Sequence, residues 1–148
     1  MVDIRRATTD DERADALSVR FDVFVDEQGV PEAIEVDGKD EDAIHFVAYD
    51  DDDDRRPVGA ARLRELDAET GKVERVAVVA GRRGEGLGRE LMAQLEATAR
   101  ERGLSTLVMH AQTSVEEFYE HLGYRTTSDV FEEAGIEHVE METSLTDR

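Results

Sequence analysis

The chain has 148 residues, of which 37 are acidic and 18 basic, so its formal net charge is −19. This length predicts one domain over residues 1–148 and is too short for a two-domain dinucleotide enzyme or a (β/α)₈ barrel. The negative charge repels nucleic acid and anionic membranes, which disfavours both as partners. Only Lys39 and Lys72 are lysines. An acidic, lysine-poor composition predicts a halophilic origin, because concentrated salt screens the self-repulsion.

The residue content also excludes several kinds of chemistry. The chain has no cysteine, which removes disulfides, thiolate metal sites and a cysteine nucleophile. No apolar run approaches about 18 residues, and the N-terminus has no hydrophobic signal segment. We therefore expect a cytoplasmic protein without a membrane span. The four histidines are scattered and predict no metal site, and the run Asp50–Asp54 predicts a solvated hairpin tip.

The first half of the chain predicts one helix and four strands. The expected elements are a strand over 2–7, a helix from 11 to about 28, an acidic loop over 31–42, and strands over 45–50, 58–66 and 73–79. Thr9 or Asp10 caps the helix, and its apolar stripe comprises Leu17, Phe21, Phe24 and Val25. A turn at 69–71 precedes the last strand, which is almost wholly apolar after Arg75 and is expected to be buried on both faces.

The second half predicts two helices and three strands. The expected elements are a helix over 86–102, a strand over 106–112, a short helix ended by Gly123, and an antiparallel pair over 125–131 and 138–143. The first of these helices places Leu87, Leu91, Leu95 and Ala99 on one stripe, with Gly103 at its C′ position. The whole order, β-α-β-β-β-α-β-α-β-β, predicts an α/β fold with a mixed, mostly antiparallel sheet of about six to seven strands flanked by helices.

Residues 73–91 join an apolar strand to a helix through a turn that contains Gly81, Gly84, Gly86 and Gly88. Glycines let backbone N–H groups approach a ligand closely, and a helix N-terminus adds free donors and positive partial charge. Arg82, Arg83 and Arg89 add charge at the same place. The pattern favours a site for a pyrophosphate over a plain strand-to-helix turn.

Two common phosphate loops do not fit the spacing of these glycines. A Walker loop requires Lys-Ser/Thr where this chain has Leu87-Gly88. A Rossmann loop requires a third glycine where the chain has Arg89.

Two motifs carry a resemblance to a known family. Arg83-Gly84-Glu85-Gly86-Leu87-Gly88 matches the R/Q-x-x-G-x-G/A signature of the GNAT superfamily of N-acetyltransferases, and FYEHLGY at 118–124 matches its Y-E-x-x-G-F helix-turn. Nearly the whole chain resembles this family in element order. Residues 19–48 and 130–141 are similar to the ElaA-like subgroup. The resemblance implies splayed central strands, acetyl-CoA as co-substrate and no metal.

The resemblance also implies how the coenzyme binds. Its pyrophosphate would lie on the amides of 83–88, its pantetheine arm would pair with the backbone of 76–78, and Gln112 would lie near that arm. The implied coenzyme-binding residues are Val76, Ala77, Val78, Arg83, Gly84, Glu85, Gly86, Leu87, Gly88, Arg89 and Gln112. Two positions depart from the family pattern, since Glu85 replaces a common basic residue and Ala80 a common proline.

The chemistry implied is attack of an amine on a thioester. Tyr119 is the candidate general acid, since a phenol of pKa about 10 can protonate a thiolate of pKa about 8.5; the alternative is core packing. Glu74 is the candidate base, with a solvated strand-end carboxylate as the alternative, and His110 is a second candidate or a structural histidine. A backbone N–H near Val78 would stabilise the oxyanion. The front helix, with Arg20, Phe24, Glu27 and Gln28, is expected to line the acceptor site.

These observations predict an N-acetyltransferase that moves an acetyl group from acetyl-CoA to a primary amine by direct attack in a ternary complex. The acceptor would be a small molecule or a peptide, and the negative surface suggests a cationic one. The protein would be a monomer or a homodimer. The alternatives are a non-catalytic acyl-CoA-binding sensor or interaction module, and a synthase of acylated signalling lactones.

Overall fold

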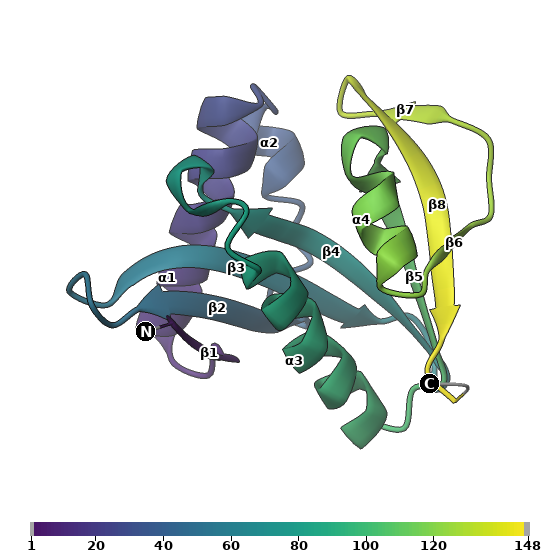
Figure 1. Ribbon diagram of the computed structural model, residues 1–148, viewed down its shortest axis with the longest axis horizontal. Helices are drawn as coiled ribbons and strands as arrows, with labels where there is room; N and C mark the ends of the chain where they lie inside the picture. Colours follow the sequence, from purple (N-terminus) through teal and green to yellow (C-terminus); the bar gives the residue numbers. More distant parts are fainter. Residues whose placement is uncertain (1, 147–148) are drawn as a thin grey trace.

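The computed structural model describes residues 2–146 (Figure 1). The elements are β1 (Val2–Arg6), α1 (Asp10–Arg20), the π-helix η1 (Phe21–Glu27), α2 (Glu32–Glu35), β2 (Ile44–Asp50), β3 (Arg56–Glu65), β4 (Thr70–Val78), the 3₁₀ turn η2 (Ala80–Arg82), α3 (Leu87–Glu101), β5 (Thr106–Gln112), the 3₁₀ turn η3 (Thr113–Val115), α4 (Glu116–His121), β6 (Arg125–Thr126), β7 (Phe131–Glu133) and β8 (Ile136–Ser144). This order confirms the predicted α/β fold class.

The strands form one sheet in the order β1-β2-β3-β4-β5-β8-β6, and β7 pairs with β8. Only β4 and β5 pair in parallel, so the sheet is mixed and mostly antiparallel as predicted. It has eight strands rather than six or seven, because the strand expected over 125–131 is divided. Its two parts pair with opposite ends of β8, Arg125 with Glu142 and Phe131 with His138.

The two central strands diverge, which confirms the expected splay. The β4–β5 ladder covers only Thr70–Val73 and Thr106–Met109 (Figure 1). Just beyond it, β4 has a bulge at which Arg75 and Val76 lie opposite the single Ala61, and Arg75 has a φ of 57°. A bulge bends its strand, so it turns the end of β4 away from β5. The expectation that this strand is buried on both faces was wrong, because its end borders the gap.

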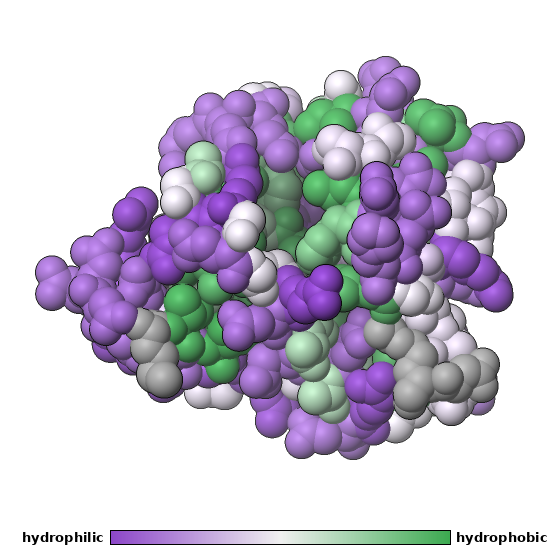
Figure 2. Space-filling model, viewed as in Figure 1, coloured by the Kyte–Doolittle hydropathy of each residue, from purple (hydrophilic) through white to green (hydrophobic). Residues whose placement is uncertain are grey.

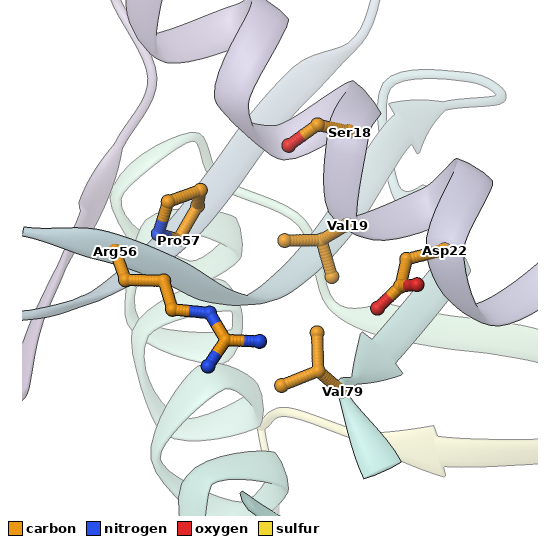
Figure 3. A pocket seen from close by; sticks show the side chains of 6 residues that line it. All are labelled: Ser18, Val19, Asp22, Arg56, Pro57 and Val79. Carbon is orange, nitrogen blue, oxygen red and sulfur yellow. The ribbon is translucent and has the colours of Figure 1, made fainter. Parts of the chain in front are cut away.

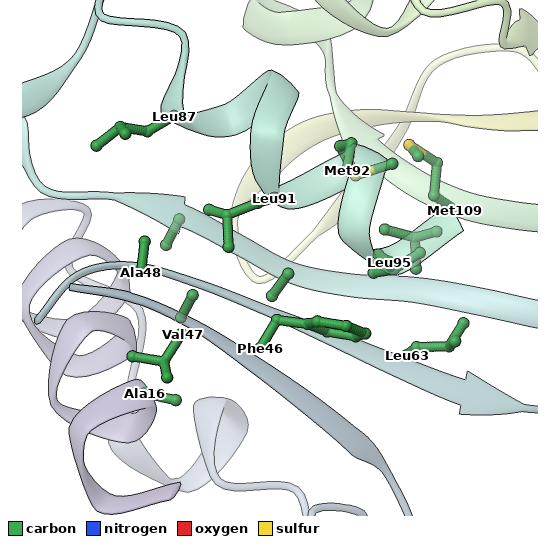
Figure 4. Close-up of a cluster of buried hydrophobic side chains, with 14 of the residues drawn as sticks. Ala16, Phe46, Val47, Ala48, Leu63, Leu87, Leu91, Met92, Leu95 and Met109 are labelled. Carbon is green, nitrogen blue, oxygen red and sulfur yellow. The ribbon is translucent and has the colours of Figure 1, made fainter. Parts of the chain in front are cut away.

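Helices cover both faces of the sheet (Figure 4). The predicted stripe of α3 is confirmed, since Leu87, Leu91, Leu95 and Ala99 are all buried. Leu91 and Leu95 lie on one side of the strands in Figure 4 and Ala16 of α1 lies on the other. No helix within residues 2–146 is long and apolar enough to cross a membrane.

The front helix differs from its prediction in which face is buried. It begins as predicted, because Thr9 and Glu12 form a capping box. The buried residues are Ala16, Val19, Arg20 and Val23, whereas Leu17, Phe21, Phe24 and Val25 are half-buried. The small side chains allow the helix to lie close to the sheet, and the π-helix η1 changes the angular spacing that a regular α-helix would have.

The structure also tests the predictions made for two turns and for the acidic loop. Residues 51–54 of the aspartate run form an exposed turn between β2 and β3 as predicted, whereas Asp50 ends β2 and its half-buried side chain pairs with Arg82. Gly71 lies inside β4 instead of in the preceding turn, and a Cβ there would be 2.9–3.0 Å from Leu104 and Leu107. Glycine is thus needed for close packing in the strand. The acidic loop over 31–42 contains the short helix α2, whose Glu35 is buried.

Candidate functional site

A cavity of about 850 Å³ lies where β4 and β5 separate. Its walls come from η1 and α2 on one side, and from α4 and the β7–β8 hairpin on the other. Figure 2 shows the hollow with hydrophobic residues inside it and hydrophilic residues on the flanks. All the predicted site residues except Glu85 and Arg20 line this cavity.

A second pocket lies between α1 and the start of β3 (Figure 3). Its volume is about 360 Å³, and Ser18, Asp22 and Arg56 contribute its polar side chains. None of the predicted site residues lines it. The larger cavity is therefore the candidate functional site.

The glycine-rich turn forms one end of the large cavity. Gly84 has a φ of 82° and Gly86 a φ of 86°, values that favour glycine strongly. A Cβ at either position would meet no atom within 4 Å, so these glycines are required by the backbone conformation and not by packing against the protein. Gly88 differs, since its Cβ would lie 3.2 Å from Phe118 of α4.

The N-terminus of α3 opens on the same end of the cavity. Gly86 is its N-cap residue, and no side chain caps the helix. The N–H groups of the first turn have no partner within a helix, and the aligned peptide dipoles leave positive partial charge there. The arrangement is suited to binding an anionic group through backbone amides.

The three arginines near this turn do not form the basic cluster that the sequence predicted. Arg82 pairs with Asp50 and with Glu85, which also keeps the Glu85 side chain outside the cavity lining. Arg83 binds both carboxylate oxygens of Glu27 at 2.6 and 2.7 Å. Arg89 is exposed and has no ion pair with any residue in the described part of the chain. The sequence missed these pairings because the carboxylates come from distant segments.

The end of β4 presents backbone groups to the gap that no neighbouring strand pairs with. The N–H of Val79 donates to the carbonyl of Val58 at 3.0 Å, which makes these two residues a hydrogen-bonded pair of the β3–β4 ladder. Backbone groups alternate in direction along an antiparallel strand, so those of Val78 point away from β3 and towards the cavity. The Val78 carbonyl accepts a 2.9 Å hydrogen bond from Arg83 Nε. An extended ligand could pair with this edge as a further strand would.

Tyr119 of α4 lines the cavity and is 6% exposed. Its ring lies edge-on to Phe118 and Tyr124, with centroid distances of 4.9 and 5.9 Å. Within residues 2–146, no group hydrogen bonds to its hydroxyl. Burial raises the pKa of Tyr119 above its ordinary value, so the phenol is fully protonated at neutral pH. The position is compatible with both predicted roles, core packing and proton donation into the cavity.

Glu74 is held by three cations. Its carboxylate lies 2.7 Å from Arg62, 2.6 Å from Arg64 and 3.5 Å from Lys72. Burial alone would raise the pKa of Glu74, but hydrogen bonds and charge from Arg64 and Arg62 outweigh it and lower the pKa to about 2. A carboxylate with this pKa accepts a proton poorly, which disfavours the predicted role of general base. The alternative of a solvated carboxylate is also wrong, because the side chain is only 9% exposed.

Glu74 belongs to a group of buried and half-buried charges that we call the arginine–carboxylate network. Its members are Arg20, Arg62, Arg64, Lys72, Arg75, Glu35, Asp37, Asp40 and Glu74. Arg62 is 0% exposed and Arg20 is 1% exposed. Arg20 was expected to contact the acceptor, but it binds Glu35 and Asp40 below the surface instead. The network holds the segment after α2 against β3 and β4, and so shapes one wall of the cavity.

The opposite wall carries His110 and Glu133. The His110 Nδ1 lies 3.0 Å from a Glu133 carboxylate oxygen, and the imidazole packs edge-on against Phe131 at 5.1 Å. Gln112 Nε2 donates to Gln28 Oε1 at 2.8 Å, and this bond connects the end of β5 with the residue that ends η1. Within residues 2–146, no cluster of three or more histidine, aspartate or glutamate side chains is suited to a metal ion.

Comparison with known proteins identifies the family. The model of the acetyltransferase (GNAT) domain family matches residues 8–145, so the chain belongs to the GNAT family. The uncharacterized N-acetyltransferase YjcF of Bacillus subtilis is 40% identical over 136 residues, which is 91% of this chain and 94% of that protein.

Solved structures agree with this assignment. The crystal structure of Escherichia coli ElaA has a TM-score of 0.83 and 28% identity, and the match covers 97% of this chain and 99% of that one. A GNAT family acetyltransferase from Elizabethkingia anophelis with acetyl-CoA bound has the same fold, with a TM-score of 0.71 and 17% identity over 97% of both chains.

Proposed function

We propose that the protein transfers an acetyl group from acetyl-CoA to a primary amine by direct attack in a ternary complex. The observation that carries the proposal is the adjacency of an uncapped helix N-terminus and a strand edge that has no strand partner. The uncapped turn before α3 suits a pyrophosphate, and the exposed edge of β4 suits the extended arm that joins it to a thioester. The acetyl-CoA in the Elizabethkingia structure, which shares this fold, supports the choice of ligand.

In this proposal the amides of 83–88 bind the pyrophosphate, and Arg89 supplies the free guanidinium beside it. Arg83 contributes through its main chain, because its side chain is engaged by Glu27. The pantetheine arm pairs with Val76 to Val78 and leads the thioester towards Tyr119. Gln112 contacts the arm after exchanging its hydrogen bond to Gln28.

The catalytic roles follow from what faces the cavity. The N–H of Val78 stabilises the oxyanion that forms when the amine attacks the thioester carbon. Tyr119 donates its proton to the departing thiolate, while its raised pKa makes that transfer less favourable than for an ordinary phenol. Since Glu74 is a weak base, we propose that His110 accepts the proton of the amine. Glu133 would hold its Nδ1–H, and Nε2, which lies 3.9 Å from a Glu140 carboxylate oxygen, would accept the proton.

The test combines coenzyme binding with turnover. Calorimetry in concentrated KCl is expected to show binding of coenzyme A, and a thiol-release assay with acetyl-CoA is expected to show turnover with at least one primary amine. Binding without any amine-dependent thiol release would indicate the alternative, an acyl-CoA sensor or interaction module. Absence of both would overturn the proposal.

We also infer that this protein works in concentrated salt and is an ElaA-like member of the family, acting in the cytoplasm as one domain. The observations that support a halophilic origin are the net charge of −19 and the near absence of lysine. Thermal melts in molar and millimolar KCl test it. The melting temperature should fall on desalting, and an unchanged value would contradict the inference.

A further inference from the structure

One wall of the cavity carries as many cations as carboxylates, in a protein that is strongly negative as a whole: Lys39, Lys72 and Arg75 lie there with Glu35, Asp37 and Glu74. The arginine–carboxylate network, part of which lines this wall, contains five cations and only four carboxylates. Lys39 lines the same wall and has no ion pair with any residue described by the structure. Glu27, a nearby acid on this side, is already neutralised by Arg83. Each carboxylate of this lining is thus already paired with an arginine, and the Lys39 ammonium is left to bind a ligand.

The two lysines of the chain both line this cavity. Lys39 is exposed, and Lys72 Nζ lies 3.5 Å from a Glu74 carboxylate that Arg62 and Arg64 contact more closely. An arginine forms fixed, planar pairs, whereas a lysine carries a compact charge on a flexible stem that can follow an anion. Elsewhere the chain uses arginine for its side-chain positive charges, so its two flexible cations both lie at this cavity.

The opposite wall supplies a negative charge. His110 and Glu133 line it, and Glu133 supplies a carboxylate that can attract an ammonium group. The two walls thus present two lysines, beside carboxylates that arginines already hold, on the α2–β4 side and a carboxylate on the β7–β8 side. A ligand that spans the cavity would be matched at both ends if it carried both kinds of charge.

We propose that the acceptor is an amine that also bears an anionic group, a carboxylate or a phosphate, and that Lys39 and Lys72 bind this group. The amine then lies towards His110 and Glu133. This deepens the proposed function, on which it rests, and replaces the cationic acceptor suggested by the net charge. The overall charge describes the outer surface, whereas the carboxylates of this cavity wall are matched one for one by cations.

Matched acceptor pairs test the proposal. The pairs are 4-aminobutyrate with 4-aminobutanamide, L-alanine with L-alaninamide, and phosphoethanolamine with ethanolamine. Thiol release is measured at the lowest KCl concentration that keeps the protein folded by circular dichroism, because salt weakens ionic contacts. The anionic member of at least one pair should have a kcat/KM higher by about fivefold to tenfold. The carboxylate and phosphate pairs show which anion is preferred.

Variants then assign the preference to the lysines. Lys39→Gln and Lys72→Gln should each lower the preference, the double variant should abolish it, and Lys39→Glu should reverse it. Arg100→Gln is the matched control, since Arg100 is exposed on α3 and does not line the cavity. This control should retain the full preference. Equal kcat/KM within every pair, or a preference that survives the double variant, would overturn the proposal.

Failure of the proposed function can be separated from failure of this inference. Calorimetry on the coenzyme A-loaded protein, and on the free protein, measures binding of phosphoethanolamine and 4-aminobutyrate without requiring turnover. Lysine-dependent binding without thiol release would support the anion site and count against the transferase. Thiol release with no preference for anionic amines would support the transferase and count against the anion site.

Discussion

The two ends of the cavity are built in different ways. The coenzyme end comes from one continuous segment, 81–89, and uses backbone amides, two left-handed glycines and a helix terminus. The acceptor end comes from side chains between Arg20 and Arg75 that are separated along the chain and meet as buried ion pairs. The first end depends on local conformation, and the second on long-range pairing.

This difference predicts different responses to mutation. A turn that works through its main chain tolerates many side chains but few changes at its left-handed glycines. A buried charge must keep its partners, because an unpaired ion in the interior is costly. Substitutions at the coenzyme end should therefore weaken coenzyme binding, whereas substitutions at the acceptor end should lower the free energy of unfolding.

The largest effect is expected for Arg62→Ala, which leaves Asp37, Asp40 and Glu74 without their shared buried partner. The free energy of unfolding should fall by about 3–5 kcal/mol, measured by urea titration in salt. Arg102→Ala is the control, because the exposed Arg102–Glu65 pair contributes at most about 1 kcal/mol. If Arg62→Ala does not fold, Arg62→Lys should give an intermediate loss. Equal losses of stability for Arg62→Ala and Arg102→Ala would contradict the predicted difference between buried and exposed ion pairs.

The next largest effect is expected for Tyr119→Phe, which tests the proton transfer between the coenzyme end and the acceptor end of the cavity. Turnover should fall by about a hundredfold while coenzyme binding is retained, since only the donor hydroxyl is removed. Stability should change little, because that hydroxyl has no hydrogen bond to residues 2–146. Tyr124→Phe is the opposite control. It loses a hydrogen bond to Glu96, so it should lower stability but not turnover. Unchanged turnover in Tyr119→Phe would remove it from the mechanism.

The acceptor end should also respond to acid. The pKa of Glu74 is about 2 in the folded chain against an ordinary 4.5, so its stabilising contribution is complete above pH 4.5 and is lost as the pH falls towards 2. The loss should be on the order of 2 kcal/mol, since a lowered pKa is a measure of stabilisation of the charged form. Urea titrations between pH 5 and 2.5 measure it. Glu74→Gln should show a shallower decline, and an identical slope would contradict the assignment.

The smallest effect is expected at the coenzyme end. Gly86→Val forces a side chain into a left-handed conformation at a cost of about 1–2 kcal/mol, and its branches occupy the space beside the amides. The affinity for coenzyme A, measured by calorimetry, should fall at least about tenfold. Gly81→Ala is the matched control, because Gly81 has neither a positive φ nor a neighbour within 4 Å of its Cβ. Equal affinity in both variants would exclude binding at this turn.

The sequence by itself determined the order of the elements, the buried stripe of α3 and the location of the glycine-rich turn. Each of these depends on residues close together in the chain, whose periodicity, capping and glycine content can be recognised in the sequence. The tertiary structure alone decided which charges are paired. It turned Arg83 towards Glu27, buried Arg20 and Arg62, and made Glu74 a poor base. The physical reason is that a pKa or an ion pair depends on distance in space, and partners such as Asp37 and Arg62 are brought together only by the packing of the segment after α2 against the sheet.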